Sequence, residues 1–494
     1  MTEASQSQYE AAVGLEVHAE LSTASKVFCG CSTRSGAPPN TQVCPICLGM
    51  PGVLPVLNRR ALEYALRVAI AVNCEIVSPM LFERKNYYYP DLPKNYQISQ
   101  KRAPLGRGGW LEIVVPSGTP ASGPGADGPI KRIGLEDVHL EEDTGKLLHA
   151  EEGDDSYIDY NRSGMPLLEL VSAPDMRTLA EVQAYMNAVR DLLLYLGVSE
   201  CRMELGQLRF EANISLRPAG REELGPRVEL KNLNSFRSVL RGLEYEMRRQ
   251  ENLLNAGERI LRETRLWDEE RGVTEPMRSK EEAQDYRYFA EPDLVPITIS
   301  AELVESTRAS LPELPAARRR RFVSQYALPE YDAEVLTSDK ALADFFESTA
   351  AAGADAKTAS NWMMGEFLRL LKETGRSAEE VSTSPSQVAQ LLKLVDGGKV
   401  SSPAAKQVFE EMFRTGRPPE EIIREKALEQ ISDEAQLASL VDQAIAQNPG
   451  AAEDFKAGKE QSLKFLMGQV MRHTRGRANP QVVQQMLLDR LKKL

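Results

Sequence analysis

Four of the six cysteines lie close together in the sequence, with a spacing that is typical of a metal site. Cys29 and Cys31 form one pair, and Cys44 and Cys47 form a second pair after twelve intervening residues. Two close pairs of thiols joined by a loop are usual ligands of Zn²⁺, although C-x₂-C is more common than the C-x-C of the first pair. With all four positions taken by thiolates, such a zinc would be structural rather than catalytic. The alternative is that these are ordinary buried thiols.

Acidic residues and one histidine share the polar faces of three short segments in which apolar and polar residues alternate. These segments are Val13–Glu20, Leu208–Leu216 and Arg227–Asn232. Successive side chains of a β-strand point to opposite faces, so the apolar residues of each segment are predicted to face a core. The opposite faces would then carry Glu16, His18, Glu211 and Glu229.

Glu169 is the most informative single residue, because it stands inside the apolar run 166–171. Burying a carboxylate without a partner is costly, so Glu169 should meet a cation, a metal ion or a proton. The segment His139–Asp143 supplies further acids. Several carboxylates and an imidazole would suit Mg²⁺, which prefers oxygen ligands and often bridges to substrate phosphates. The alternative is that these residues form the solvated face of a half-exposed sheet.

The elements that would position these residues change in character near residue 295. Before it, strand-like and helix-like segments alternate, with long loops that contain Gly and Pro. After Ala301, strand signals nearly vanish and apolar residues recur at spacings of three and four. This pattern predicts a mixed strand and helix region followed by a helical appendage in two pieces.

The composition limits the classes of function. The chain has 494 residues, 42% of them hydrophobic and 27% charged, which is ordinary for a globular protein of about three domains. A net charge of −12 argues against indiscriminate nucleic-acid binding. We see no run of about 18 apolar residues and no export signal, and therefore expect a cytoplasmic protein without a membrane span. The sequence contains no P-loop motif, and its one G-x-G-x-x-G match lies in a Pro/Gly-rich loop.

Two segments have the composition of surfaces that bind nucleic acid. Phe82–Gln97 contains four Tyr and three basic residues in a turn-rich loop. Lys459–Leu494 contains eight Lys or Arg against two acidic residues. A hydrogen-bonded tyrosine loop and a solvated helix face are the respective alternatives.

Several long strings together resemble the B subunits of the bacterial aspartyl/glutamyl-tRNA amidotransferases. The strings run along essentially the whole chain, which makes the resemblance specific. They are Val13–His18, Cys44–Pro55, Arg84–Gln97, His139–Asp143, Asp159–Pro166, Val228–Ser235, Asp285–Phe289 and Gly468–Pro480.

This resemblance implies an α+β, cradle-like catalytic domain with a mixed or antiparallel sheet at residues 1–293, including the zinc knuckle at 29–47. An all-α helical domain would follow at 294–410, and a small all-α tail domain that binds tRNA at 411–494. The activity implied is that of an ATP-dependent carbon–nitrogen ligase. The side-chain carboxylate of Glu on tRNA(Gln), or of Asp on tRNA(Asn), would attack the γ-phosphate of ATP. Ammonia from a partner amidase, the A subunit, would then displace phosphate.

The resemblance also implies partners and site residues. The partners would be the A subunit, a small C subunit and the misacylated tRNA, in a heterotrimeric enzyme. Many members of the family have Asp where this chain has Glu211, so the carboxylate is kept with a longer reach. The structural Zn²⁺ would be held by Cys29, Cys31, Cys44 and Cys47, and the tail would contact tRNA through Arg472, Arg475 and Arg477. The positions that match the family's catalytic, Mg²⁺-binding residues are Glu16, His18, Glu142, Glu169, Glu211 and Glu229.

Two other functions stay open at this point. A non-catalytic, zinc-containing tRNA-binding scaffold would leave the acidic strand faces as solvated surface. A metal-dependent hydrolase acting on a small substrate would leave the basic tail without a role. The sequence also does not distinguish Glu-tRNA(Gln) from Asp-tRNA(Asn) as the substrate.

Overall fold

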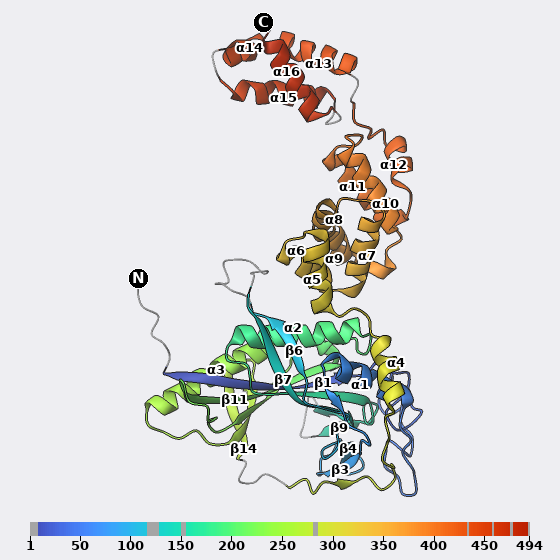
Figure 1. Ribbon diagram of the computed structural model, residues 1–494, viewed down its shortest axis with the longest axis vertical. Coiled ribbons are helices and arrows are strands. Elements are labelled where there is room, and N and C mark those ends of the chain that lie inside the picture. The colour runs from blue at the N-terminus through green and yellow to red at the C-terminus, as the bar shows by residue number, and fades with distance from the viewer. Residues whose placement is uncertain are drawn as a thin grey trace. The chain divides into compact units, whose positions relative to one another are not determined.

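The computed structural model describes residues 8–115, 128–149, 155–279, 285–431, 434–456, 459–474 and 478–492. The chain divides into two compact units, Met1–Arg318 and Arg319–Leu494 (Figure 1). The first unit contains strands and helices, and the second is helical in its described residues. This confirms the predicted fold class, an α+β region followed by a helical region. No helix among the described residues is long and apolar enough to cross a membrane.

A large mixed sheet forms the centre of the first unit, and its middle strand is β1 (Tyr9–Glu20). Only the pair β12–β13 is parallel among the pairings of this sheet in the described residues, and the other pairs are antiparallel. Strand β6 (Trp110–Val114) pairs with β7 beside the main path. The order across the sheet is β14 (Val273–Ser279), β13 (Glu263–Asp268), β12 (Val228–Leu233), β11 (Leu208–Pro218), β1, β10 (Pro166–Ser172), β7 (Ile130–Glu142), β5 (Gly106–Arg107) and β2 (Glu75–Ile76).

Two small sheets lie outside the large one. In the first, β3 (Glu83–Asn86) pairs with β4 (Tyr96–Ser99) on one side and with β15 (Phe289–Ala290) on the other. In the second, β8 (Lys146–His149) pairs with β9 (Ser156–Asp159). The pairing of β15 with β3 ties residues near 290 back to the tyrosine-rich segment that follows β3.

Helices cover the apolar face of the large sheet, as α2 and α3 show in Figure 1. Val13, Leu15 and Val17 of β1 are fully buried in this core, as the alternation predicted. Each of the three long helices begins at a residue whose side chain accepts hydrogen bonds from the first turn, namely Asn58, Thr178 and Ser235. The helical segments of this unit are α1 (Arg59–Ala71), α2 (Leu179–Tyr195), the 3₁₀ turn η2 (Met203–Leu205), α3 (Phe236–Asn255) and α4 (Ala301–Ala309).

The second unit has two separate apolar cores. The first is rich in phenylalanine, including Phe322, Phe367 and Phe409, and the second begins at Leu437. Helix α5 (Pro315–Tyr326) begins before the boundary of the unit. The helices of the first core are α6 (Glu330–Thr337), α7 (Lys340–Ala351), α8 (Ala356–Trp362), the π-helical turn η4 (Met363–Phe367), α9 (Leu368–Thr374), η5 (Ala378–Glu380), α10 (Pro385–Asp396), α11 (Ser402–Thr415) and α12 (Pro419–Glu425). Those of the second are α13 (Glu434–Gln447), α14 (Pro449–Lys456), α15 (Gln461–His473) and α16 (Pro480–Leu491).

The boundary between the compact units, at Arg318 and Arg319, differs from the domain boundaries expected at residues 293 and 410. Residue 293 lies inside the first unit, because Ile299 and the apolar side chains of α4 pack against its core. Residue 410 lies inside α11, whose Phe409 and Phe413 are both buried in the first helical core. Apolar spacing in a sequence marks a helix but not the core against which that helix packs.

Glu246 of α3 is a fully buried carboxylate that joins this helix to the sheet. It accepts hydrogen bonds from Arg249 Nη2 (2.6 Å), Gln250 Nε2 (2.8 Å) and Thr274 Oγ1 of β14 (3.0 Å). Because every donor is oriented toward this carboxylate, its removal would leave buried polar groups unsatisfied.

We therefore predict that Glu246→Ala lowers the free energy of unfolding of the first unit by about 3–5 kcal/mol. Equilibrium urea unfolding followed by tryptophan fluorescence measures the change. The matched control is Glu244→Ala on the same helix, which removes an exposed ion pair with Arg248 and should cost less than about 1 kcal/mol. Equal unfolding midpoints for the two variants would contradict the prediction.

Candidate functional site

Strand register places charged residues from four strands in one row on the polar face of the large sheet. His18 of β1 lies directly opposite Glu169 of β10 on one side and Arg209 of β11 on the other. Glu169 in turn lies opposite His139 of β7. Directly opposed residues of antiparallel strands point to the same face, so these side chains meet. The buried partner that the sequence required for Glu169 is therefore a pair of histidines.

The distances define a chain of alternating acids and imidazoles. His18 Nε2 is 3.4 Å from Glu169 Oε2 and 3.8 Å from Glu141 Oε1. His139 Nε2 is 3.1 Å from the same oxygen of Glu169, and its Nδ1 is 2.7 Å from Asp137 Oδ1. Asp137 therefore orients His139, and His139 orients Glu169. We call His18, Glu141 and Glu169 the acidic cluster; a ligand atom of each lies within 4.8 Å of the others.

The electrostatics of the acidic cluster favour ionised Glu169. Burial opposes its ionisation, but the charges of His18 and His139 hold the pKa of Glu169 well below its usual value. Burial likewise opposes the charged form of both imidazoles, and the Glu169 carboxylate raises the pKa of His18 to about 9 and that of His139 to about 10.

Negative charge on this face nevertheless remains undercompensated. Burial and the charge of Glu169 raise the pKa of Glu141. Burial and the charges of Glu169 and Glu211 raise the pKa of Glu16. A raised carboxyl pKa indicates that an additional cation would be favourable there. The donor set, two carboxylates and an imidazole, fits a divalent cation such as Mg²⁺.

Three further acids of the predicted set, Glu16, Glu211 and Glu229, lie beside the acidic cluster, and the last two of them pair with Lys231. Glu211 of β11 lies directly opposite Glu16 of β1. Lys231 Nζ of β12 is 2.5 Å from Glu211 Oε2 and 3.2 Å from Glu229 Oε1. Asn213 Nδ2 donates to Glu16 Oε1 at 2.9 Å. Glu16, His18, Glu169, Glu211 and Glu229 thus share one face of the sheet.

Glu142 lies elsewhere, and the structure brings Glu141 into the acidic cluster in its place. Adjacent residues of β7 point to opposite faces, and Glu141 has the same parity as His139. Glu142 forms an ion pair with Lys94 and accepts a hydrogen bond from the Ile98 backbone N–H at 2.8 Å. The strong parity signal in 137–142, with Val138 and Leu140 buried, could have selected Glu141 and His139 from the sequence.

Lys85 of β3 is a further cation beside the acidic cluster that sequence reasoning did not single out. Its ammonium lies 5.8 Å from the ring centroid of Tyr87 and 5.2 Å from that of Tyr286. Burial acts against its charge, but Glu141 leads the charges that raise the pKa of Lys85. The tyrosine-rich segment therefore supplies the Lys85 ammonium, which lies between tyrosine rings, to the site. Tyr88 and Tyr89 of the same segment are exposed.

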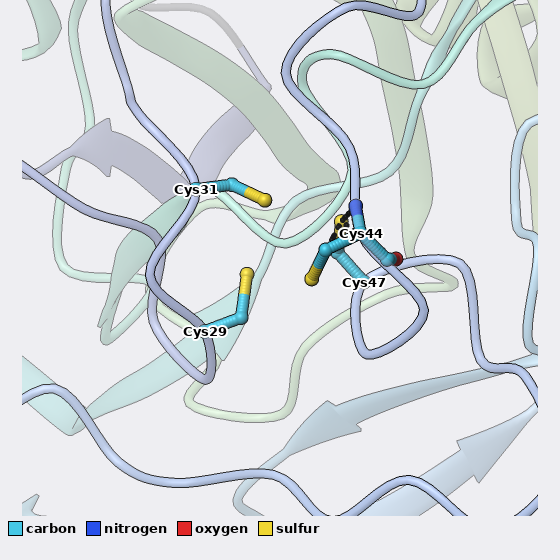
Figure 2. A group of neighbouring side chains, drawn as sticks. All are labelled: Cys29, Cys31, Cys44 and Cys47. Carbon is cyan, nitrogen blue, oxygen red and sulfur yellow. Dashed lines mark hydrogen bonds between the residues drawn. The ribbon is translucent and has the colours of Figure 1, made fainter.

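The four clustered cysteines converge from two loops, as Figure 2 shows. The four Sγ atoms all lie within 4.8 Å of one another, and Cys44 Sγ is 3.9 Å from Cys47 Sγ. Tetrahedral zinc with bonds of about 2.3 Å places sulfurs about 3.8 Å apart, so the arrangement fits a tetrathiolate site. A hydrogen bond from Cys29 lowers the pKa of the Cys47 thiol below its usual value.

Comparisons with known proteins agree with this architecture over nearly the full chain. Residues 11–305 match the family described as the GatB/GatE catalytic domain, and residues 344–491 match the GatB domain. The B subunit of the aspartyl/glutamyl-tRNA(Asn/Gln) amidotransferase from Thermoanaerobacter sp. (strain X514) is 53% identical over 486 residues, covering 98% of this chain and 100% of that protein. The B subunit of the same enzyme from Caldanaerobacter subterraneus subsp. tengcongensis is 54% identical, with the same coverage.

The chain belongs to the family of amidotransferase B subunits. The catalytic-domain match contains the acidic cluster and all four clustered cysteines. The second match spans α15, on whose last turn Arg472 is exposed. Arg475 and Arg477, the other two basic residues expected to contact tRNA, lie outside the described residues.

Titration of the two histidines in this chain tests the geometry of the acidic cluster. In metal-free protein we expect midpoints of about 9 for His18 and about 10 for His139. Because these pKa values are raised, the stability from the two ion pairs is complete below about pH 6.5 and is lost as the pH rises through 9 and 10. Glu169→Gln removes the shared charge and should lower both midpoints.

NMR of ¹³C-labelled histidine measures these midpoints, since the chain has only 4 His. Glu112→Gln, which removes an ion pair with Arg132, is the control and should leave both midpoints unchanged. An ordinary midpoint near 6.5 for His18 in the unaltered protein would contradict the geometry.

Proposed function

We propose that this chain activates the side-chain carboxylate of Glu on tRNA(Gln), or of Asp on tRNA(Asn), by transfer of the γ-phosphoryl group of ATP. The observation that carries the proposal is the convergence of His18, Glu141 and Glu169 on the buried polar face of the sheet. The family supports the same conclusion, because the relatives are named as subunits of an aspartyl/glutamyl-tRNA(Asn/Gln) amidotransferase.

The reaction has two steps. A carboxylate oxygen of the aminoacyl group attacks the γ-phosphorus, forming an O–P bond as the bond from that phosphorus to ADP breaks. Ammonia then attacks the acyl carbon of the resulting acyl phosphate, forming the C–N bond and releasing phosphate and a proton. The first step brings an anion toward a polyanion, so the site must neutralise charge and exclude water.

The residues of this face can meet that requirement. Glu141, Glu169 and His18 would hold the cation, and Glu16, Glu211 and Glu229 would add negative charge beside it on the same face of the sheet. Bound Mg²⁺ would shield phosphate oxygens and stabilise the charge that develops on them. Lys85 adds a fixed positive charge on the side of Glu141. His139 holds Glu169 in one orientation through its 3.1 Å contact.

The partners follow from the chemistry. The proposed step makes an acyl phosphate but does not produce ammonia. We assign the production of ammonia to a partner amidase, the A subunit, in a heterotrimer with a small C subunit. The basic residues after Lys459 are proposed to hold the tRNA backbone, with Arg472 on the exposed side of α15 as one contact. A cytoplasmic location stays a prediction.

Phosphate release tests this proposal. In the complex with the A and C subunits, release of ³²P from [γ-³²P]ATP should require both Mg²⁺ and Glu-tRNA(Gln) or Asp-tRNA(Asn). Glu169→Gln and His18→Ala should each reduce the tRNA-dependent rate at least about 100-fold, because both remove a group that holds the cation. Glu112→Gln serves again as the control with an unchanged rate.

Isotope transfer checks the chemical step itself. When both oxygens of the side-chain carboxylate of the aminoacyl-tRNA are ¹⁸O, one ¹⁸O should appear in the phosphate for each amide formed. Phosphate without ¹⁸O would exclude the acyl phosphate. Release that persists in both site variants would instead favour a non-catalytic tRNA-binding scaffold.

We also propose that the four clustered cysteines hold one structural Zn²⁺. Purified chain should contain about one zinc atom per molecule, and Cys44→Ser should lose it together with thermal stability. Elemental analysis measures the zinc content. Cys201→Ala, a buried thiol far along the sequence, is the control and should keep the metal. Full zinc content in Cys44→Ser would contradict the tetrathiolate assignment.

A further inference from the structure

Lys26 is a fully buried lysine whose ammonium lies against the cysteine cluster. Its Nζ is 3.6 Å from Cys47 Sγ and 3.5 Å from the Tyr160 carbonyl oxygen, and none of its surface is exposed. Two other lysines of the first unit pair with acids, Lys94 with Glu142 and Lys231 with Glu211. In the described part of the chain, no carboxylate lies within ion-pair distance of Lys26. Its anionic partner is therefore the sulfur.

The residues around Lys26 join the cysteine loops to the turn that precedes β10. The Lys26 backbone N–H donates to the Cys31 carbonyl at 3.0 Å, and Ser163 Oγ donates to the Cys47 carbonyl at 3.2 Å. A Cβ at Gly164 would lie 3.4 Å from Cys47 Cβ and 3.6 Å from Lys26 Cδ. Gly164 also has a φ of +82°, a backbone conformation that disfavours a side chain there. This turn thus lies in van der Waals range of both Cys47 and the Lys26 side chain.

The loop between the two cysteine pairs is fastened to the same region. Asn40 Nδ2 donates to the Ile158 carbonyl at 2.9 Å, and its Oδ1 accepts from the Tyr160 N–H at 2.8 Å. Asn161 Nδ2 donates to the Pro38 carbonyl at 2.8 Å. The cysteine cluster is consequently docked on the body of the first unit, and Cys47 and Lys26 are the members of this contact that are buried there.

Charge balance explains why a lysine stands there. Four thiolates and one Zn²⁺ carry a net charge of −2, and burying that charge is unfavourable unless it is paired or hydrogen-bonded. A buried ammonium is equally unfavourable by itself. Placed 3.6 Å from Cys47 Sγ, the two compensate each other, and the N–H donor withdraws electron density from the thiolate.

We propose that Lys26 is a positioning residue for the zinc site, whose ammonium donates to the Cys47 thiolate and slows loss of the metal. This inference rests on the proposed zinc occupancy. It assigns to Lys26 a role in metal retention and none in the transfer of the phosphoryl group.

The test compares zinc release from the purified full-length chain and its variants to an excess of a chromogenic chelator. Lys26→Met removes the charge and the donor at similar volume, and should release zinc about 10–100-fold faster. Lys26→Gln keeps a donor without charge and should be intermediate, while Lys26→Arg should restore slow release. Lys131→Met is the matched control, because Lys131 also donates to a backbone carbonyl but pairs with Glu181.

Cobalt substitution gives a second signature that a purely structural role would not produce. Losing the N–H donor raises the energy of the sulfur lone pairs, so the sulfur-to-cobalt charge-transfer band should move to longer wavelength in Lys26→Met and return in Lys26→Arg. If Lys26→Met does not fold, the contrast between Lys26→Gln and Lys26→Arg decides the question.

The possible outcomes distinguish the assignment of the zinc site from the assignment of Lys26 to it. Wild-type chain without zinc would overturn the zinc site itself. Wild-type chain with zinc, but with equal release rates and cobalt spectra in all Lys26 variants, would overturn the role of Lys26 and leave the zinc site standing. Faster release from Lys131→Met to the same degree would show that any lost lysine loosens the metal, which would also overturn the specific role of Lys26.

Discussion

The burial of Glu169 in the middle of a sheet is the constraint on which the rest of the site depends. A carboxylate in an apolar strand must be neutralised, and antiparallel register limits the available partners to residues directly opposite on β1 and β7. Those partners are His18 and His139, and Asp137 fixes the second of them at 2.7 Å. The pairing secures Glu169, but it leaves Glu141 and Glu16 with unneutralised charge. The same constraint therefore yields a stable core and a site that is still short of positive charge.

Much of this face could be predicted from single strands. Period-two alternation with buried apolar residues places Glu16, His18, Glu211 and Glu229 together, and the structure has them on one face. The family resemblance of the segment His139–Asp143 could not decide between Glu141 and Glu142, because both residues are acidic. Only the alternation of side chains along β7 places them on opposite faces of the sheet. The place of Lys85 in the site was even less predictable from the sequence. Lys85 reaches the site from β3, which belongs to a different sheet, and no spacing in the sequence encodes that approach.

The boundaries of the compact units show the same distinction between local and long-range information. Helices after residue 301 were predictable from spacings of three and four, and caps such as Ser300 and Asp339 begin two of them. The assignment of a helix to a core was not predictable, because it depends on which apolar faces meet. Helix α4 packs with the sheet domain, while α11 lies within the phenylalanine-rich core. The cysteine spacing, by contrast, was local enough to predict the convergence of all four thiols.

Pulsed electron paramagnetic resonance of bound Mn²⁺ tests the central claim, that His18 and its acidic neighbours hold a divalent cation. Mn²⁺ prefers the same oxygen and imidazole ligands and reports directly coordinated nitrogen through its ¹⁴N coupling. The account predicts a ¹⁴N coupling in the unaltered chain that disappears in His18→Gln and persists in His139→Gln, because His139 acts through Glu169. A coupling that survives in His18→Gln, or is absent from the unaltered chain, would contradict it.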